Sequence, residues 1–280
     1  MIIRNPIAAG YFYPRDPSDL RVTIEKFMRR AKVDKEVILG AVAPHAGYIY
    51  CGEPQAYVYN SIIENPTFVI IGPNHTGLGS NASIMCEGIW NTPFGSCRID
   101  SEIARKILGN SRFLKEDIHS QTQEHSIEVQ LPWLQYKFNS VKFIPIVIGS
   151  DDKEVYKDIG YAIKKAIEMT KTIVVASSDF THYGYVYDYV PVTGSPETIL
   201  KYVENVDKEA AKAICERNPD KFLNVVEKYS ATICGKGAIA TMLYALKENA
   251  LKGRLLKYST SYEVSKDANS LVGYAGIILI

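Results

Sequence analysis

The chain has 280 residues, 46% of them hydrophobic and 22% charged, the balance of a globular protein that buries a core without disulfides. Its 32 Lys and Arg against 31 Asp and Glu leave a net charge of +1, which argues against a nucleic-acid or membrane-surface binder. We find neither a signal peptide nor an apolar run near the roughly 20 residues of a membrane span. The five cysteines are scattered without a C-x-x-C pair, which is typical of reduced thiols in a cytosol. We therefore expect a cytoplasmic globular protein.

Short apolar runs rich in Ile and Val alternate with helical patterns along the chain. Because the runs lack a polar face, they are typical of strands covered on both sides. Strands are predicted at Val37–Ala43, Thr67–Ile71, Val141–Ile148, Thr172–Ala176 and Leu271–Ile280, and more weakly at Ala82–Cys86, Gly95–Ile99 and Arg254–Ser259. Helices are predicted at Asp16–Arg30, Ser101–Leu108, Glu124–Tyr136, Lys153–Met169, Ser195–Arg217, Pro219–Lys228 and Gly237–Asn249. This alternation predicts an α/β fold with a mostly parallel or mixed central sheet and helices on both faces.

No repeat, low-complexity tract or flexible linker divides the chain, so residues 1–280 are expected to form a single domain. Asp16 and Ser18 are expected to cap the first helix. Pro132 lies inside a helical pattern and is expected to kink or restart that helix. The long loop Tyr183–Pro196, rich in aromatic residues, is expected to form a rim or lid.

Histidines follow three of the predicted strands, at the point where each strand ends. The first strand leads into "APHAGYIY" with His45, the second into "GPNHTG" with His75, and the fourth into "SSDFTHYG" with Asp179 and His182. Open α/β sheets bind ligands beyond the carboxyl ends of their strands. Each histidine lies near Gly or Pro, and glycine lets backbone approach a ligand closely. We therefore predict that these side chains share one functional site.

Cys234, in "TICGKG", lies just ahead of a predicted helix. The positive end of a helix dipole stabilises a thiolate, which would be a metal ligand or a nucleophile. A buried neutral cysteine would only pack, and the local sequence leaves both interpretations open. Lys236 does not belong to a phosphate-binding loop, because the G-x-x-x-x-G-K-[ST] pattern is absent. The other four cysteines are expected to pack in the core.

The segment "QEHSIEVQLPWLQ" contains His125 and Glu128 at a spacing that places both on one face of a helix. A hydrogen-bond network at a helix end is the favoured interpretation. Two other interpretations stay open. The pair could form a second metal site, or it could lie behind the ligands of the main site and orient them. His119 is expected to be a solvated loop residue.

The motifs "AAGYFYPRDPSDL", "APHAGYIYCG", "GPNHTG", "EHSIEVQLPWLQ", "SSDFTHYG" and "TICGKGAI", in this order from Ala8 to Ile239, resemble those of the Memo family. That family is similar in fold to the class III extradiol dioxygenases (LigB-like). The resemblance implies a metal held by His45, His75 and Cys234. His182 and Asp179 would then be catalytic residues beside it.

The related dioxygenases hold Fe(II) with two histidines and a glutamate, whereas Cys234 occupies the carboxylate position here. A thiolate favours iron, copper or zinc as softer centres and is itself oxidisable. The resemblance therefore implies metal binding but leaves ring-opening chemistry open. Tyr48 and Asn74, in the motifs of His45 and His75, are expected to line the pocket or support the ligands, as are His125 and Glu128.

Three functions are compatible with these residues. The favoured one is a metal-dependent, redox or dioxygenase-related activity on an unidentified small molecule. The second is a module that binds peptides or phosphopeptides, using the aromatic loop "HYGYVYDYVP" and basic residues such as Arg98 and Lys236. The third is metal-free catalysis by Cys234, activated by His182 and Asp179. This function would leave His45 and His75 without a role. The oligomeric state stays open.

Overall fold

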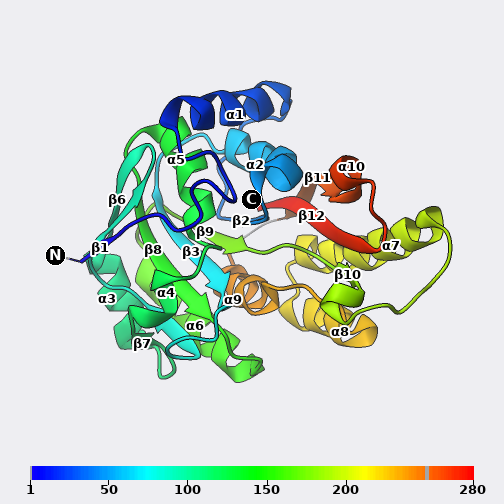
Figure 1. Ribbon diagram of the computed structural model, residues 1–280. Coiled ribbons are helices and arrows are strands. Elements are labelled where there is room, and N and C mark those ends of the chain that lie inside the picture. The colour runs from blue at the N-terminus through cyan, green and yellow to red at the C-terminus, as the bar shows by residue number, and fades with distance from the viewer. Residues whose placement is uncertain (1, 250–251) are drawn as a thin grey trace.

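The central sheet is built around four neighbouring parallel strands (Figure 1). A computed structural model describes residues 2–249 and 252–280, and these residues form a 12-stranded sheet. The four strands stand in the order β8 (Lys142–Ile148), β3 (Thr67–Pro73), β9 (Thr172–Ser177) and β2 (Gly40–Ala43). Their buried faces explain the apolar runs in the sequence. The predicted α/β fold is confirmed.

The other strands extend the sheet on both sides and make it mixed. On one side β6 pairs with β8 in parallel, and on the other β12 pairs antiparallel with β2. The bounds of these strands are β1 (Ile3–Arg4), β4 (Ala82–Ile84), β5 (Ile89–Thr92), β6 (Gly95–Ile99), β7 (Lys115–Glu116), β10 (His182–Gly184), β11 (Gly253–Thr260) and β12 (Ser270–Leu279). Every predicted strand is present: Gly95–Ile99 has the predicted bounds, and the others have shifted ends. Strands β1, β5, β7 and β10 are additional.

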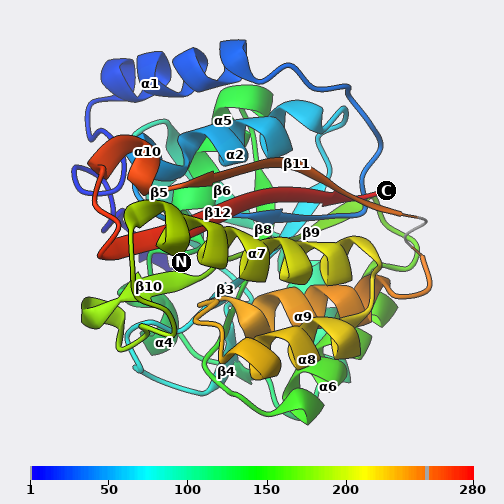
Figure 2. The same ribbon diagram turned by 90° about the vertical axis from the view of Figure 1, so that its right-hand side faces the viewer.

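Helices cover both faces of the sheet, as the two views show. One face carries α1 (Pro17–Arg30), α2 (Tyr48–Ser61) and α5 (Leu131–Phe138). The opposite face carries α3 (Ser101–Asn110), α6 (Lys153–Ile167), α8 (Pro219–Tyr229) and α9 (Lys236–Leu246), and α7 (Pro196–Cys215) packs beside β11 and β12 (Figure 2). The short helices are α4 (His119–Thr122), α10 (Tyr262–Ser265), η1 (Glu128–Gln130) and η2 (Tyr185–Tyr187). Within the described ranges, no helix is long and apolar enough to cross a membrane.

Helix α2 was not predicted from the sequence. It contains Pro54, which removes a helical hydrogen bond and disfavours a helix interior. Its residues are buried on several sides, so no polar face gives the sequence a helical period. Gly52 belongs to the same helix, where a β-carbon would meet the ring of Phe27 at 2.6 Å. Close packing against α1, rather than local propensity, therefore determines this helix.

The helix predicted over Glu124–Tyr136 begins later than expected. Pro132 occupies the first turn of α5, so the predicted restart at this proline is confirmed. The residues before it form a turn and the 3-10 helix η1. His125 therefore lies outside any helix, and the prediction that it shares a helix face with Glu128 is wrong. At the first helix, the carboxylate of Asp16 accepts the backbone N–H groups of Ser18 and Asp19, which confirms that cap, whereas Ser18 lies within the helix.

Candidate metal centre

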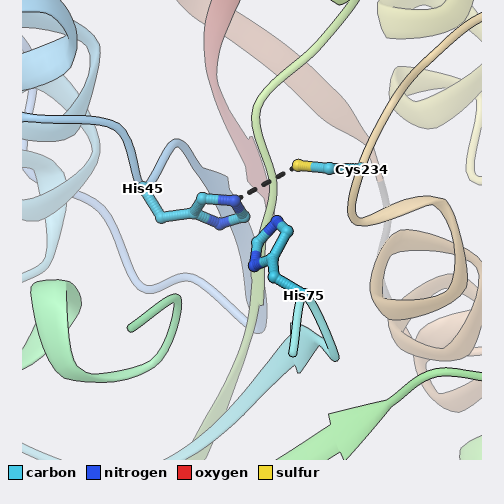
Figure 3. A group of neighbouring side chains, drawn as sticks. All are labelled: His45, His75 and Cys234. Atoms are coloured by element: carbon cyan, nitrogen blue, oxygen red, sulfur yellow. Dashed lines mark hydrogen bonds between the residues drawn. The ribbon is translucent and has the colours of Figure 1, made fainter. Parts of the chain in front are cut away.

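The carboxyl ends of three adjacent strands bring His45 and His75 together (Figure 3). Strand β9 lies between β2 and β3. His45 follows β2 by two residues, and His75 follows β3 by two residues, so the two imidazoles flank the end of β9. Cys234 reaches the same place from the loop between α8 and α9. Three segments far apart in the sequence thus meet at one edge of the sheet.

The three side chains are close enough to hold one ion. Their donor atoms all lie within 4.8 Å of one another. Cys234 Sγ is 3.2 Å from His45 Nε2, and the rings of His45 and His75 are 5.1 Å apart and nearly perpendicular. His45 is buried, and burial together with the neighbouring His75 and His125 lowers its pKa well below its usual value. His45 is therefore neutral, the form in which an imidazole binds metal.

Glu124 orients His75. One carboxylate oxygen accepts the His75 backbone N–H at 2.7 Å, and the other lies 3.0 Å from Nδ1 of the ring. Burial alone would lower the pKa of His75, but the hydrogen bond and charge of Glu124 outweigh it and raise that pKa. Burial would likewise raise the pKa of Glu124, yet its contacts with His75 and His125 lower it to about 2. A carboxylate behind a histidine fixes the ring and increases its basicity toward a metal.

His125 completes the wall beside His75. The two rings stack at 4.8 Å, and Phe12 stacks on the other face of His125 at 4.3 Å. Burial lowers the pKa of His125 to about 4, so it is neutral at pH 7. His75, Glu124 and His125 form a second group of potential ligands. Because Glu124 also accepts the Ser126 N–H at 2.9 Å, its oxygens are already engaged, and an orienting network describes the group better than a second ion does.

Glu128 points away from this centre, toward the N-terminal segment. Its carboxylate pairs with Arg4 at 2.6 Å and accepts the Tyr13 hydroxyl at 2.5 Å. It also accepts the backbone N–H groups of Ile7 and Ala8, both at 2.9 Å. Glu128 therefore anchors the N-terminal segment beneath Phe12. Glu128 was predicted to line the pocket or support the ligands together with His125. In the structure its carboxylate instead holds the N-terminal segment.

Asp179 and His182 lie at the end of β9, as the sequence predicts. Asp179 is buried, and one of its oxygens accepts the His45 backbone N–H at 2.7 Å. Burial raises the pKa of this carboxyl group. His182 is half-buried, with Nδ1 at 2.9 Å from the Phe180 carbonyl and 3.0 Å from the Thr232 carbonyl. Asp179 thus holds the backbone of one candidate ligand, and His182 is tied to the loop that carries Cys234.

Asp207 fixes the same segment from α7. Its buried carboxylate accepts the Thr181 hydroxyl at 2.5 Å and backbone N–H at 3.1 Å, and the Tyr258 hydroxyl at 2.8 Å. A β-carbon at Gly273 would lie 1.9 Å from this carboxylate, which explains the glycine there. Burial raises the pKa of Asp207 to about 6, although the hydrogen bonds from Thr181 and Tyr258 act to lower it. The turn between Asp179 and His182 is therefore held by hydrogen bonds from Thr181 to a buried carboxyl group.

The raised pKa of Asp207 predicts a pH-dependent stability. A carboxyl group with a raised folded-state pKa contributes stability at low pH and loses it as the pH rises through about 6. Relative to Asp207→Asn, the wild type should lose about 3 kcal/mol between pH 4 and pH 7, since each pKa unit corresponds to about 1.4 kcal/mol. Urea denaturation of both proteins across this range measures the difference. A difference that does not change with pH would contradict the assignment.

Tyr48 and Asn74 support the two histidine loops instead of contacting the candidate ligands. The Tyr48 hydroxyl donates to the Val129 carbonyl at 2.6 Å, and its ring is fully buried. Asn74 Oδ1 accepts the Thr76 hydroxyl at 2.8 Å and the Gly77 N–H at 3.0 Å. This is an Asx-type turn that shapes the loop around His75. Both residues are structural supports of the centre.

The sequence left a thiolate and a neutral thiol open for Cys234, and the structure favours the neutral thiol in the metal-free protein. Burial and the nearby Asp179 carboxylate raise the pKa of Cys234. Moreover, the imidazole in contact with Sγ belongs to His45, not to His182. The geometry therefore lacks the predicted Cys–His–Asp arrangement for metal-free catalysis, and the thiol becomes a thiolate only if a cation compensates the charge.

A cleft of about 830 Å³ reaches Cys234 from the side of α6 and α8. Its walls include Thr232, Lys236 and the apolar side chains of Tyr156 and Leu223. Lys236 pairs with Asp151 at 3.0 Å at this cleft. The cleft therefore borders the residue that carries the candidate sulfur ligand.

The remaining predicted residues lie elsewhere. Cys51, Cys86 and Cys97 are buried, as expected, and Cys215 is half-buried. His119 is exposed, as expected, but begins the short helix α4. Arg98 lies on β6, where it lines a small cleft with Ile2 and Glu87 away from the candidate centre.

Sequence reasoning missed Glu124, Ser177 and Gln130 as supports of the centre. Ser177 Oγ lies 2.9 Å from His45 Nδ1, and the Gln130 amide donates to the same oxygen at 2.7 Å. The three residues belong to the motifs "EHSIEVQLPWLQ" and "SSDFTHYG". Their only sequence signal is the accumulation of polar residues in otherwise apolar surroundings.

The fold and the site define a mixed α/β protein with a candidate His-His-Cys metal centre at the carboxyl edge of its sheet. The chain belongs to the Memo-like protein family, whose model matches residues 4–278. The resemblance drawn from the motifs is thereby confirmed.

Relatives match over nearly their full length. A MEMO1 family protein of Pyrococcus horikoshii is 38% identical over 287 residues, covering 99% of both chains. A MEMO1 family protein of Nitrosopumilus maritimus is 38% identical over 289 residues, covering 100% of both. Among solved structures, an uncharacterized protein from Escherichia coli K12 superposes with a TM-score of 0.54 at 11% identity, covering 86% of this chain and 99% of the other. At this identity the likeness concerns the fold alone.

Proposed function

We propose that this Memo-like protein binds one metal ion through His45, His75 and Cys234 and uses it in a redox or dioxygenase-related reaction on a small molecule. The observation that carries the proposal is the convergence of two imidazoles and one thiol within 4.8 Å. Two nitrogens and one sulfur form a soft to borderline donor set, which favours iron or copper, with zinc as a third candidate. The bound ion would supply an open coordination position and, for iron or copper, electron transfer.

The chain's own residues would prepare this site. Glu124 and Asp179 hold the ring of one histidine and the backbone of the other. His182 donates Nδ1–H to one of the two carbonyl oxygens beside it, because carbonyls only accept. Its Nε2 is therefore free to take a proton from a substrate. We propose His182 as the acid–base residue and Asp179 as its less direct partner.

Reconstitution tests the proposal. Chelator-stripped protein should be incubated without oxygen with Fe(II), Cu(I) or Zn(II), desalted, and its bound metal measured. We expect close to one ion per chain for at least one of these metals. Retention of none of the three would refute the proposal.

The scattered free cysteines also favour a reducing compartment, and we propose a cytoplasmic location. Fractionation of the source cells, with antibodies against the protein, would test this. Recovery in an oxidising compartment would contradict it.

A second candidate function is peptide binding at the rim of the same centre. Exposed apolar side chains lie near the site residues in the sequence: Tyr11 beside Phe12 is 83% exposed, Ile49 in the first turn of α2 66% and Tyr185 in η2 82%. Lys236 lines the same cleft as Cys234, whereas Arg98 lines a different one. Calorimetric titration with tyrosine-phosphorylated and unphosphorylated peptides would test this function. Binding no tighter than about millimolar, near −4 kcal/mol, would count against it.

A further inference from the structure

Ser177 lies behind His45 at the centre of a buried hydrogen-bond network. It is the last residue of β9 and is fully buried. Its hydroxyl oxygen is 2.6 Å from the Ser126 carbonyl oxygen, 2.7 Å from the Gln130 amide nitrogen and 2.9 Å from His45 Nδ1. A hydroxyl has one proton to donate and two lone pairs to accept with, so these three contacts use its full capacity.

The three contacts determine where the proton of Ser177 goes. A carbonyl oxygen is only an acceptor, and two oxygens 2.6 Å apart repel unless a proton lies between them. The hydroxyl of Ser177 must therefore donate to Ser126. The hydroxyl then has no proton left for His45 Nδ1. This third contact is a hydrogen bond only if Nδ1 carries the proton and donates it to the Ser177 oxygen.

Gln130 could weaken this assignment if its amide were reversed. Its nitrogen is also 2.9 Å from the Pro44 carbonyl oxygen, so a reversed amide would place two acceptors against each other. Its oxygen accepts the Tyr59 hydroxyl at 2.7 Å. The amide nitrogen thus faces Ser177 and donates to it, which leaves one lone pair of the hydroxyl for His45.

We propose that Ser177 is a positioning residue that holds His45 in the tautomer with the proton on Nδ1, so that the bare Nε2 lone pair faces Cys234. This inference rests on the proposed metal function and adds the device that prepares its first ligand. Nε2 is the nitrogen 3.2 Å from the thiol sulfur. The arrangement matches that of His75, where the Glu124 carboxylate accepts from Nδ1. A hydroxyl oxygen behind His45 and a carboxylate oxygen behind His75 thus both favour the tautomer with the proton on Nδ1.

Nuclear magnetic resonance of the metal-free protein tests the tautomer directly. In protein labelled with ¹⁵N at histidine, the nitrogen shifts and their couplings to ring protons distinguish an Nδ1–H ring from an Nε2–H ring. We expect His45 and His75 to be Nδ1–H. An Nε2–H form of His45 in the wild type would overturn the proposal, whether or not any metal binds.

Two serine substitutions separate positioning from general packing. In Ser177→Ala, an Nε2–H population of His45 should appear while His75 keeps its tautomer. The Zn²⁺ affinity should fall about 10–100-fold, as is usual when a partner behind a metal ligand is lost. Ser61→Ala is the matched control, because Ser61 is equally buried and donates only to the Val58 carbonyl within α2.

The control should leave both tautomers and the affinity unchanged. An unchanged His45 tautomer in Ser177→Ala would overturn the proposal, as would an unchanged Zn²⁺ affinity. If the wild type binds no metal at all, the proposed function fails, and the tautomer measurement still decides the role of Ser177.

Discussion

Cys234→Ala is expected to lower the affinity for the bound metal more than 100-fold. Loss of a residue behind a metal ligand costs about 10–100-fold, and loss of a ligand itself should cost more. The thiol is also the only sulfur donor of the His45, His75 and Cys234 group. Competition titration with a chelator of known affinity, performed without oxygen, measures the change.

Cys215→Ala is the matched control for this substitution. Cys215 is a free, half-buried thiol like Cys234, but it lies at the end of α7 beside Gly253. Its removal should leave the metal affinity within about twofold of the wild type. Equal affinities for Cys234→Ala and Cys215→Ala would show that the sulfur at position 234 does not bind metal.

Glu128→Gln is expected to reduce the free energy of unfolding by about 3–5 kcal/mol, because it leaves the Arg4 guanidinium buried without a counter-charge. Arg4 is 4% exposed and lies 4.1 Å from the Trp90 ring. Its other nitrogens donate to the carbonyls of Gln121 and Glu124. Loosening Arg4 should therefore also disturb the loop that carries Glu124. Urea denaturation measures the free energy of unfolding of the variant and the wild type.

A surface ion pair provides the comparison. Glu87 and Arg105 pair at 2.7 Å with both side chains more than half exposed. Glu87→Gln should cost less than about 1 kcal/mol, because water screens exposed pairs. Similar losses for the two substitutions would contradict the structural role assigned to Glu128.

The location of the candidate centre could be predicted from the sequence because of a simple topological rule. Parallel strands end at the same edge of a sheet, so residues just after β2, β3 and β9 had to meet. His45, His75 and Asp179 lie there for this reason. Cys234 follows no strand, and its position just ahead of a predicted helix and the family resemblance suggested it instead.

The contacts behind the ligands could not be predicted. Glu124 and His75 are 49 residues apart, and Ser177 and His45 are 132 residues apart. Which polar group faces which ring depends on loop conformation and side-chain direction, and periodicity carries no information on either. Glu128 is a further example. The H-x-x-E spacing suggested that it lies beside His125 on one helix face, but its carboxylate binds the N-terminal segment.

The missed helix has a different cause. Helix α2 contains a proline and is buried on several sides, so both propensity and hydrophobic period disfavour its prediction. Its N-terminus at Tyr48 follows directly after the His45 loop. The helix that fixes one side of the centre is thus determined by tertiary packing.

The most direct test of the account is the metal content and coordination of protein purified without oxygen or chelator. Elemental analysis should find close to one iron, copper or zinc ion per chain. X-ray absorption at the edge of that metal should show one sulfur and two or more nitrogen or oxygen neighbours. Protein that holds no metal after purification and reconstitution, or a bound metal without a sulfur neighbour, would contradict the proposed centre of His45, His75 and Cys234.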